Sequence, residues 1–184
     1  MVVHTATTTR VQTHDGETAT MLAVPPEVTE ALVLVQSDSP LVAAEGFSKL
    51  SHATFNNPLA KEAAGAIGAV RAIADAMTRN IENGTVQEDG CHALRNVTFR
   101  CDANLRLVRE EGGIAAVAAA MDAHPENEAL QAEGCWALLV FCSNQDENIA
   151  AAKSFLHVVT KASATYPSNA EIKSKSMFLQ ALLA

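Results

Sequence analysis

Three segments of the sequence align with one another without gaps, and their spacing decides the fold: AEGFSKLSHATF (44–55), EDGCHALRNVTF (88–99) and AEGCWALLVFCS (132–143). One glycine holds the same position in each copy, so the copies lie 44 residues apart at Gly46, Gly90 and Gly134. Apolar residues repeat at two more positions, as Leu50, Leu94 and Leu138 and as Phe47, Cys91 and Cys135. Such a period indicates a repeat architecture, in which each unit buries its apolar face against its neighbours.

The sequence between these segments also repeats, over residues 56–77, 103–124 and 147–165. Each copy predicts a short helix that begins near Asn or Asp, a break, and a second helix. Glycine predicts the break at Gly65 and at Gly112-Gly113, because glycine readily takes the left-handed conformation that ends a helix. The third copy has Ser154-Phe155 at this place. Each unit therefore contains three helices.

The long third helices are expected over residues 40–55, 83–99, 127–143 and 169–184. The last of them is aligned 44 residues after the third copy, so that Ala181 matches Ala137. Before the first long helix, PPEVTEALVLVQ (25–36) predicts a helix with Pro26 in its first turn, where proline is tolerated. The repeats thus begin part-way through a unit.

Composition supports helices and excludes several function classes. The 184 residues include 34 alanines, with 48% hydrophobic but only 4% aromatic residues, which favours close-packed helices over sheets. The formal net charge of -8 argues against direct binding to nucleic acid or to an anionic membrane. No apolar run reaches the roughly 18 residues that a membrane-spanning helix needs. Four cysteines among apolar residues favour a reducing compartment, the cytoplasm or alternatively the nucleus.

Residues 1–24 differ from the repeat domain that we expect over 25–184. Asp15-Gly16 lies between two Thr- and Val-rich stretches and predicts a hairpin turn. A flexible tail is the alternative. The N-terminal arm is therefore expected to be either a two-stranded ribbon or flexible.

These features resemble the armadillo repeat family over residues 25–184. The three-helix unit, the glycine breaks in AAGAIGAV and EEGGIAAV, and the third helices GCHALRNVTF and GCWALLVFC carry the resemblance. It implies an all-α, right-handed superhelix of about three and a half three-helix repeats. The HEAT family ranks second, because its units have two helices and lack this glycine break. Armadillo proteins are non-catalytic scaffolds or adaptors whose third helices line a concave groove for extended peptides or other proteins.

The family's peptide-binding branch carries a Trp and, four residues later, an Asn on each third helix. This sequence matches that pattern only in part. Trp136 is followed by Val140, Asn96 is preceded by His92, and the first copy has Ser48 and His52. Binding of nuclear signals in the manner of the importin alpha proteins is therefore not implied.

Residues at i−3, i and i+4 share one face of a helix, and this spacing predicts the partner-binding residues. They are Glu45, Ser48 and His52, then Asp89, His92 and Asn96, then Glu133, Trp136 and Val140. The acidic column of Glu45, Asp89 and Glu133 beside Trp136 favours a basic partner segment, through ion pairs and cation–π contact. The alternative is that these acids are merely solvated. Residues 110–152 contain eight acids and no Lys or Arg.

The sequence predicts no catalytic residue, no metal site and no cofactor. It has no CxxC or HxxxH spacing, and GAIGAV follows a predicted helix instead of a strand. Cys91 and Cys135 hold equivalent positions that we expect in the core. A second function remains open, because the last helix ends in the apolar SMFLQALLA (176–184). That helix favours a structural subunit that self-assembles, as a homo-oligomer, or docks in a larger complex through its terminal helices, or a chain that is a fragment of a longer repeat array.

Overall fold

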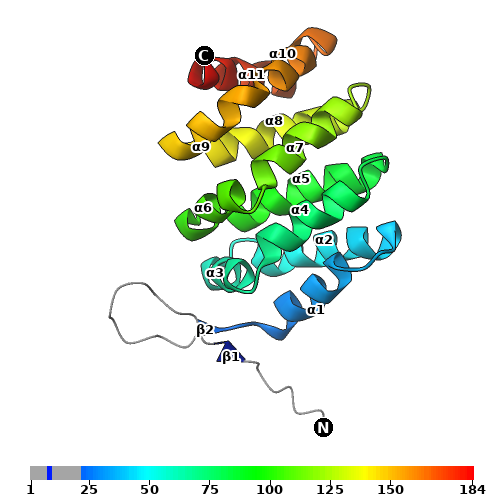
Figure 1. Ribbon diagram of the computed structural model, residues 1–184, viewed down its shortest axis with the longest axis vertical. Coiled ribbons are helices and arrows are strands. Elements are labelled where there is room, and N and C mark those ends of the chain that lie inside the picture. Colours follow the sequence, from blue (N-terminus) through cyan, green and yellow to red (C-terminus); the bar gives the residue numbers. More distant parts are fainter. Residues whose placement is uncertain (1–7, 10–21) are drawn as a thin grey trace.

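The computed structural model describes residues 8–9 and 22–184 as a stack of helices (Figure 1). The helices are α1 (Pro26–Val35), α2 (Pro40–Thr54), α3 (Pro58–Ala66), α4 (Ala69–Arg79), α5 (Gly84–Thr98), α6 (Asp102–Glu110), α7 (Gly113–Ala123), α8 (Glu128–Cys142), α9 (Asp146–Ala152), the 3-10 turn η1 (Lys153–Phe155), α10 (Leu156–Thr165) and α11 (Ala170–Leu183). The all-α prediction is confirmed. The four long helices are α2, α5, α8 and α11, and their bounds agree with the predicted ranges to within one residue.

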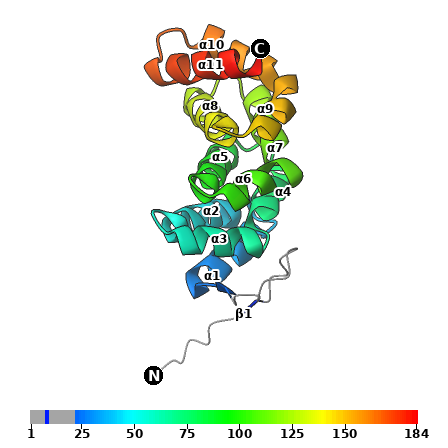
Figure 2. The same ribbon diagram turned by 90° about the vertical axis from the view of Figure 1, so that its left-hand side faces the viewer.

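Equivalent helices of successive units pack side by side in three rows. The long helices α2, α5, α8 and α11 form one row, and α1, α4, α7 and α10 form a second. The short helices α3, α6 and α9 form the third (Figures 1 and 2). The first and last helices consequently lie at opposite ends of an elongated stack.

Asparagine starts most of the long helices. The side-chain oxygens of Asn83, Asn127 and Asn169 accept hydrogen bonds from first-turn amides of α5, α8 and α11, at 2.9 to 3.1 Å. Asn57 caps the short helix α3 in the same way. These bonds satisfy amides that have no partner within the helix. The Asn or Asp cap predicted for the short helices is found only at Asn57, because α6 and α9 follow Cys101 and Gln145, whose side chains form no cap bond.

The break after the short helix is made by a left-handed glycine in two units. Gly68 has φ 83° and Gly112 has φ 81°, again 44 residues apart. The prediction for Gly65 was therefore wrong, because Gly65 lies inside α3. An ideal Cβ on Gly65 would stand 1.8 Å from Asn104 Oδ1, so this glycine is needed for close packing.

The third unit makes the same break differently. The turn η1 joins α9 to α10, and no residue from 146 to 165 has a positive φ. This junction is two residues shorter, so α11 follows α8 by 42 residues, as Asn127 and Asn169 show. The buried Ile172, Ser176 and Leu179 then match Leu130, Gly134 and Ala137. The alignment of Ala181 with Ala137 was thus displaced by two residues.

Buried amides close the C-terminal ends of the helices. Gln87 Nε2 donates to the carbonyl oxygens of Met77 and Asn80 at the end of α4, and Gln131 repeats this contact at the end of α7. Asn104 and Asn148 cap the ends of α5 and α8 in a comparable way. These side chains satisfy last-turn carbonyls that a helix cannot satisfy by itself.

The N-terminal arm is described only at its two ends. β1 (Thr8–Thr9) pairs antiparallel with β2 (Leu22–Ala23), with Thr8 opposite Ala23. The predicted Asp15-Gly16 turn lies outside the described residues. Within the part of the chain that the structure describes, no helix combines the length and the apolar character that crossing a bilayer requires.

Candidate functional site

The nine predicted partner-binding residues, here called the third-helix surface, lie on α2, α5 and α8 in the row of long helices (Figure 2). Most of them are exposed or half-buried, as the spacing predicts. Val140 differs, because it is buried and belongs to the hydrophobic core. It therefore contributes packing and offers almost no surface to a partner. His52 Nδ1 lies 2.8 Å from the carbonyl oxygen of Ser48, which holds the ring against its own helix.

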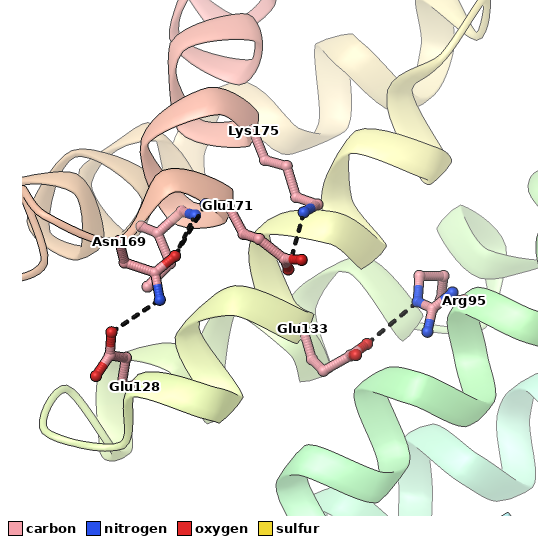
Figure 3. Close-up of polar contacts among 7 residues, drawn as sticks. Arg95, Glu128, Glu133, Asn169, Glu171 and Lys175 are labelled. Carbon is pink, nitrogen blue, oxygen red and sulfur yellow. Dashed lines mark hydrogen bonds and ion pairs between the residues drawn. The ribbon is translucent and has the colours of Figure 1, made fainter.

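Trp136 is flanked by two cations of the same chain. The guanidinium of Arg95, on α5, lies 3.9 Å from the centre of the indole, and the ammonium of Lys175, on α11, lies 4.7 Å from it. Both cations are held by carboxylates: Arg95 Nε lies 3.1 Å from Glu133, and Lys175 Nζ lies 3.1 Å from Glu171. Figure 3 shows these two pairs across α5, α8 and α11. The indole remains 37% exposed.

The cation–π contact that the sequence predicts at Trp136 is thus made within the chain. The side chains of Arg95 and Lys175 are only 12% and 16% exposed, so their charges are partly removed from water. Under such conditions a cation–π contact contributes more than at an open surface. The contacts join three consecutive long helices, and they fix the position of Trp136 in the middle of the row.

The acidic segment 110–152 does not form a bare acidic face. Four of its eight acids make ion pairs with bases from outside the segment: Glu110 and Glu147 with Arg109, Asp122 with Lys161, and Glu133 with Arg95. Glu128 accepts a hydrogen bond from Asn169, also drawn in Figure 3. The bases come mostly from residues 38 or 39 positions away, which lie in the neighbouring units.

Two neighbouring carboxylates on α5, those of Glu88 and Asp89, are less well balanced by nearby positive charges. Burial, and then the charges of Asp89 and Glu133, raise the pKa of Glu88 above its ordinary value, while His92 opposes this shift. Burial likewise raises the pKa of Asp89. Among the described residues neither carboxylate forms an ion pair. The charges of Asp89 and Glu133 therefore act on Glu88, and Glu133 is already paired with Arg95, whereas a cation beside Glu88 and Asp89 would offset their charges.

We predict that Glu88→Gln combined with Asp89→Asn makes the chain more stable at neutral pH. These pKa values are raised in the folded chain. At pH values just above the ordinary carboxyl pKa, the folded chain therefore binds more protons than the unfolded chain. The free energy of unfolding of the parent therefore rises as the pH falls through that window. The amides do not titrate, so the advantage of the variant should shrink on acidification. Thermal unfolding at neutral and mildly acidic pH measures this, and an advantage that grows in acid would contradict it.

The cysteines are unsuited to nucleophilic chemistry. All four are free and buried, and burial raises the pKa of Cys135 to about 12 and that of Cys142 to about 11. The thiolate is the reactive form, so these side chains behave as small apolar residues. Among the described residues no group of three His, Cys, Asp or Glu side chains is placed to hold a metal ion.

Sequence reasoning missed Glu88, Arg95 and Lys175. Arg95 lies three residues after His92 and so shares its helix face, which is a signal that the spacing already contained. Lys175 could not be placed, because its register depends on the shorter junction between α9 and α10. With the correct offset of 42 residues, Lys175 holds the position of Glu133.

Comparison with known proteins adds no family assignment. No protein-family model matches the chain, and no curated protein shows significant similarity to it.

Proposed function

We propose that this chain is a non-catalytic protein-binding scaffold or adaptor, of the armadillo type, that holds an extended basic segment of a partner on the third-helix surface. The carboxylates of Glu88 and Asp89 carry this proposal. They lie half-buried beside Glu133 with raised pKa values, and the described residues place no cation on them. An arginine or lysine of a partner would supply that cation.

The repeated long helices also support binding of an extended segment. The row of α2, α5 and α8 repeats one acidic position, as Glu45, Asp89 and Glu133, at the spacing of the units. Trp136 gives the middle of the row a fixed aromatic surface, because Arg95 and Lys175 hold the indole in place. Four free, buried cysteines suit the cytoplasm or another reducing compartment.

The test uses a short peptide of alternating glycine and arginine, with a glycine–glutamate peptide as its opposite. Trp136 is the only tryptophan, so its fluorescence reports binding near the site. Glu88→Lys with Asp89→Lys should weaken binding of the arginine peptide by about tenfold or more. Glu133 is left unchanged, because Arg95 depends on it.

The control variant is Asp75→Lys with Glu82→Lys. It changes the net charge equally, at exposed positions on α4 and on the turn before α5. Binding should stay close to that of the parent chain. Equal weakening by both double variants would show a general charge effect, and unchanged binding in the first variant would refute the proposed site.

A second candidate function is a structural subunit that self-assembles or docks through its terminal helices. Exposed apolar side chains on the last helix favour it, namely Met177, Phe178 and Leu182. Single residues of this kind are common on surfaces, but Phe178 and Leu182 lie one turn apart and Met177 is adjacent to Phe178. Different measurements test the two candidate functions. The first requires peptide binding, and the second requires an increase in the molecular mass of the particle in solution.

A further inference from the structure

We propose that the outer face of α11 in one copy docks on a recess beside α1 in a second copy, so that the chains associate head to tail. The α11 face consists of Lys173 and Met177, one turn apart, together with the adjacent Phe178, which holds the position of Trp136. The α1 recess is lined by Glu27, Glu30, Lys49, His52 and Ala53. This inference rests on the second candidate function, and it names the partner as another copy of this chain.

Met177 on the α11 face holds a position that is buried between units elsewhere in the stack. With the offset of 42 residues, Met177 holds the position of Cys135, and the earlier copies have Cys91 and Phe47 there. All three of these earlier side chains are fully buried. Met177, by contrast, is 60% exposed, and Phe178 beside it is 55% exposed.

That position faces the next long helix of the row. Helix α5 packs on α8, and α8 packs on α11. Burial and then the charges of Glu133 and Cys135 on α8 raise the pKa of Cys91, and burial raises the pKa of Cys135 while Lys175 on α11 opposes that shift. Met177 therefore points to where the next long helix of a stack would lie. A large apolar side chain in that position is expected to be covered by a partner.

The α1 recess lies at the opposite end of the stack (Figures 1 and 2). It is an open hollow of about 480 Å³ between α1 and α2. Glu27 and Glu30 lie one turn apart on its rim, and both are exposed. Val33, 65% exposed, adds apolar surface one further turn along α1.

The α1 side of the recess corresponds to positions that are buried in the next unit. The buried residues Val28, Ala31 and Val35 of α1 match Val70, Ile73 and Met77 of α4, again 42 residues apart. By the same offset, Glu27 and Glu30 correspond to Ala69 and Ala72, which are buried in α4. Both ends of the stack thus present positions that are buried in other units: Met177 on the row of long helices, and Glu27 and Glu30 on the row that contains α1.

The charges of the two surfaces favour a head-to-tail arrangement over symmetric contacts, in which two α11 faces or two α1 recesses would meet. Residues 22–49, which include Lys49 of the α1 recess, contain four acids and one lysine, whereas residues 153–184 contain four lysines and one glutamate. Lys173 is exposed near the start of α11, where it can meet the carboxylates of Glu27 and Glu30 in a second copy. Two α11 faces placed together would bring lysines together, which costs free energy.

A contact between two different surfaces is heterologous and does not end at a dimer. Sedimentation or light scattering over a concentration series should therefore show an average mass that passes beyond the dimer. Salt should weaken the association, because part of it is ionic.

Two end variants and their mixture test the arrangement. The tail variant is Met177→Glu with Phe178→Ser, and the head variant is Glu27→Lys with Glu30→Lys. All these side chains are exposed, so both variants should fold, which circular dichroism and thermal unfolding verify. Each variant alone should be monomeric, and an equal mixture should form a one-to-one dimer, because it contains one intact α11 face and one intact α1 recess. The control is Asp75→Lys with Glu82→Lys, which should associate like the parent.

Three results would overturn the proposal. A parent chain that stays monomeric over the whole concentration series would rule out self-assembly. It would overturn both this inference and the self-assembling version of the second candidate function. A head variant that still associates would show that α11 packs on α11, which overturns only the head-to-tail geometry. A mixture that remains monomeric while the parent associates would show that the contact lies elsewhere. His52 belongs to both the third-helix surface and the α1 recess, but the peptide test reads out binding at Glu88, Asp89 and Trp136, which lie outside the recess.

Discussion

Replacing Asn148 by alanine is expected to lower the free energy of unfolding by about 3 kcal/mol. Asn148 is buried, and its Nδ2 donates to the carbonyl oxygens of Phe141 and Leu105, both at 2.8 Å. Phe141 is in the last turn of α8, where its carbonyl has no partner within the helix. The alanine variant leaves that carbonyl buried and unsatisfied, and it also leaves a small cavity.

Asn104→Ala should behave in the same way, because Asn104 makes the same two contacts one unit earlier, to Val97 and Lys61. Equilibrium unfolding in urea measures both losses. The matched control is Gln145→Ala, three residues before Asn148, since Gln145 is half-buried and its side chain makes no hydrogen bond to the described residues. A loss for Asn148→Ala no greater than that for the control would show that the cap contributes little.

Asn148→Asp separates the hydrogen bonds from the cavity. Aspartate fills nearly the same volume, but its carboxylate only accepts hydrogen bonds. At neutral pH it would face two carbonyl oxygens, so we expect a loss at least as large as that of the alanine variant. A loss well below it would show that packing, and not donation, explains the effect of alanine.

Gly46→Ala is expected to have the second large effect on the free energy of unfolding. The substitution should destabilise the chain, although helix propensity favours alanine over glycine. An alanine inside a helix normally gains about 1 kcal/mol over glycine. An ideal Cβ on Gly46, however, would stand 2.4 Å from the backbone nitrogen of Val35 and 2.8 Å from the carbonyl carbon of Leu34. Backbone atoms of a packed helix cannot move aside cheaply, so we expect a net loss of about 2 kcal/mol.

The equivalent glycines provide the comparison. A Cβ on Gly90 would meet Met77 Cγ at 2.5 Å, and one on Gly134 would meet Met121 Cγ at 2.6 Å. These neighbours are flexible methionine side chains, which can adopt another rotamer. Gly90→Ala and Gly134→Ala should therefore lose clearly less than Gly46→Ala in urea unfolding. Equal losses at the three positions would show that the backbone contact at Gly46 is not the cause.

The helices could be predicted from the sequence because their signals are local. Apolar spacing places the buried faces, and Asn83, Asn127 and Asn169 start the long helices through bonds to their own first turns. The glycine break was harder, because Gly65 and Gly68 stand three residues apart and either could end α3. Only the packing distinguishes them, since Asn104 from the next unit occupies the space beside Gly65.

The candidate site could be predicted only in outline. The helix face of Asp89, Glu133 and Trp136 followed from spacing, but the cations on Trp136 come from neighbouring units. Which base reaches which acid depends on how the rows of helices are set against one another. The buried amides were missed as well, although Gln87 and Gln131, like Asn104 and Asn148, lie 44 residues apart. Their periodicity was visible, but polar residues were not expected in the core.

The buried asparagines also bear on how the chain folds. Asn104 bonds to the carbonyl of Lys61, and Asn148 to that of Leu105, each 43 residues earlier in the chain. His124 reaches Ile81 over the same separation. Each bond joins a unit to the one before it, so forming it closes a loop of about one unit, and the entropy lost is similar at every step. Any adjacent pair of units can therefore form first, and order then spreads from neighbour to neighbour.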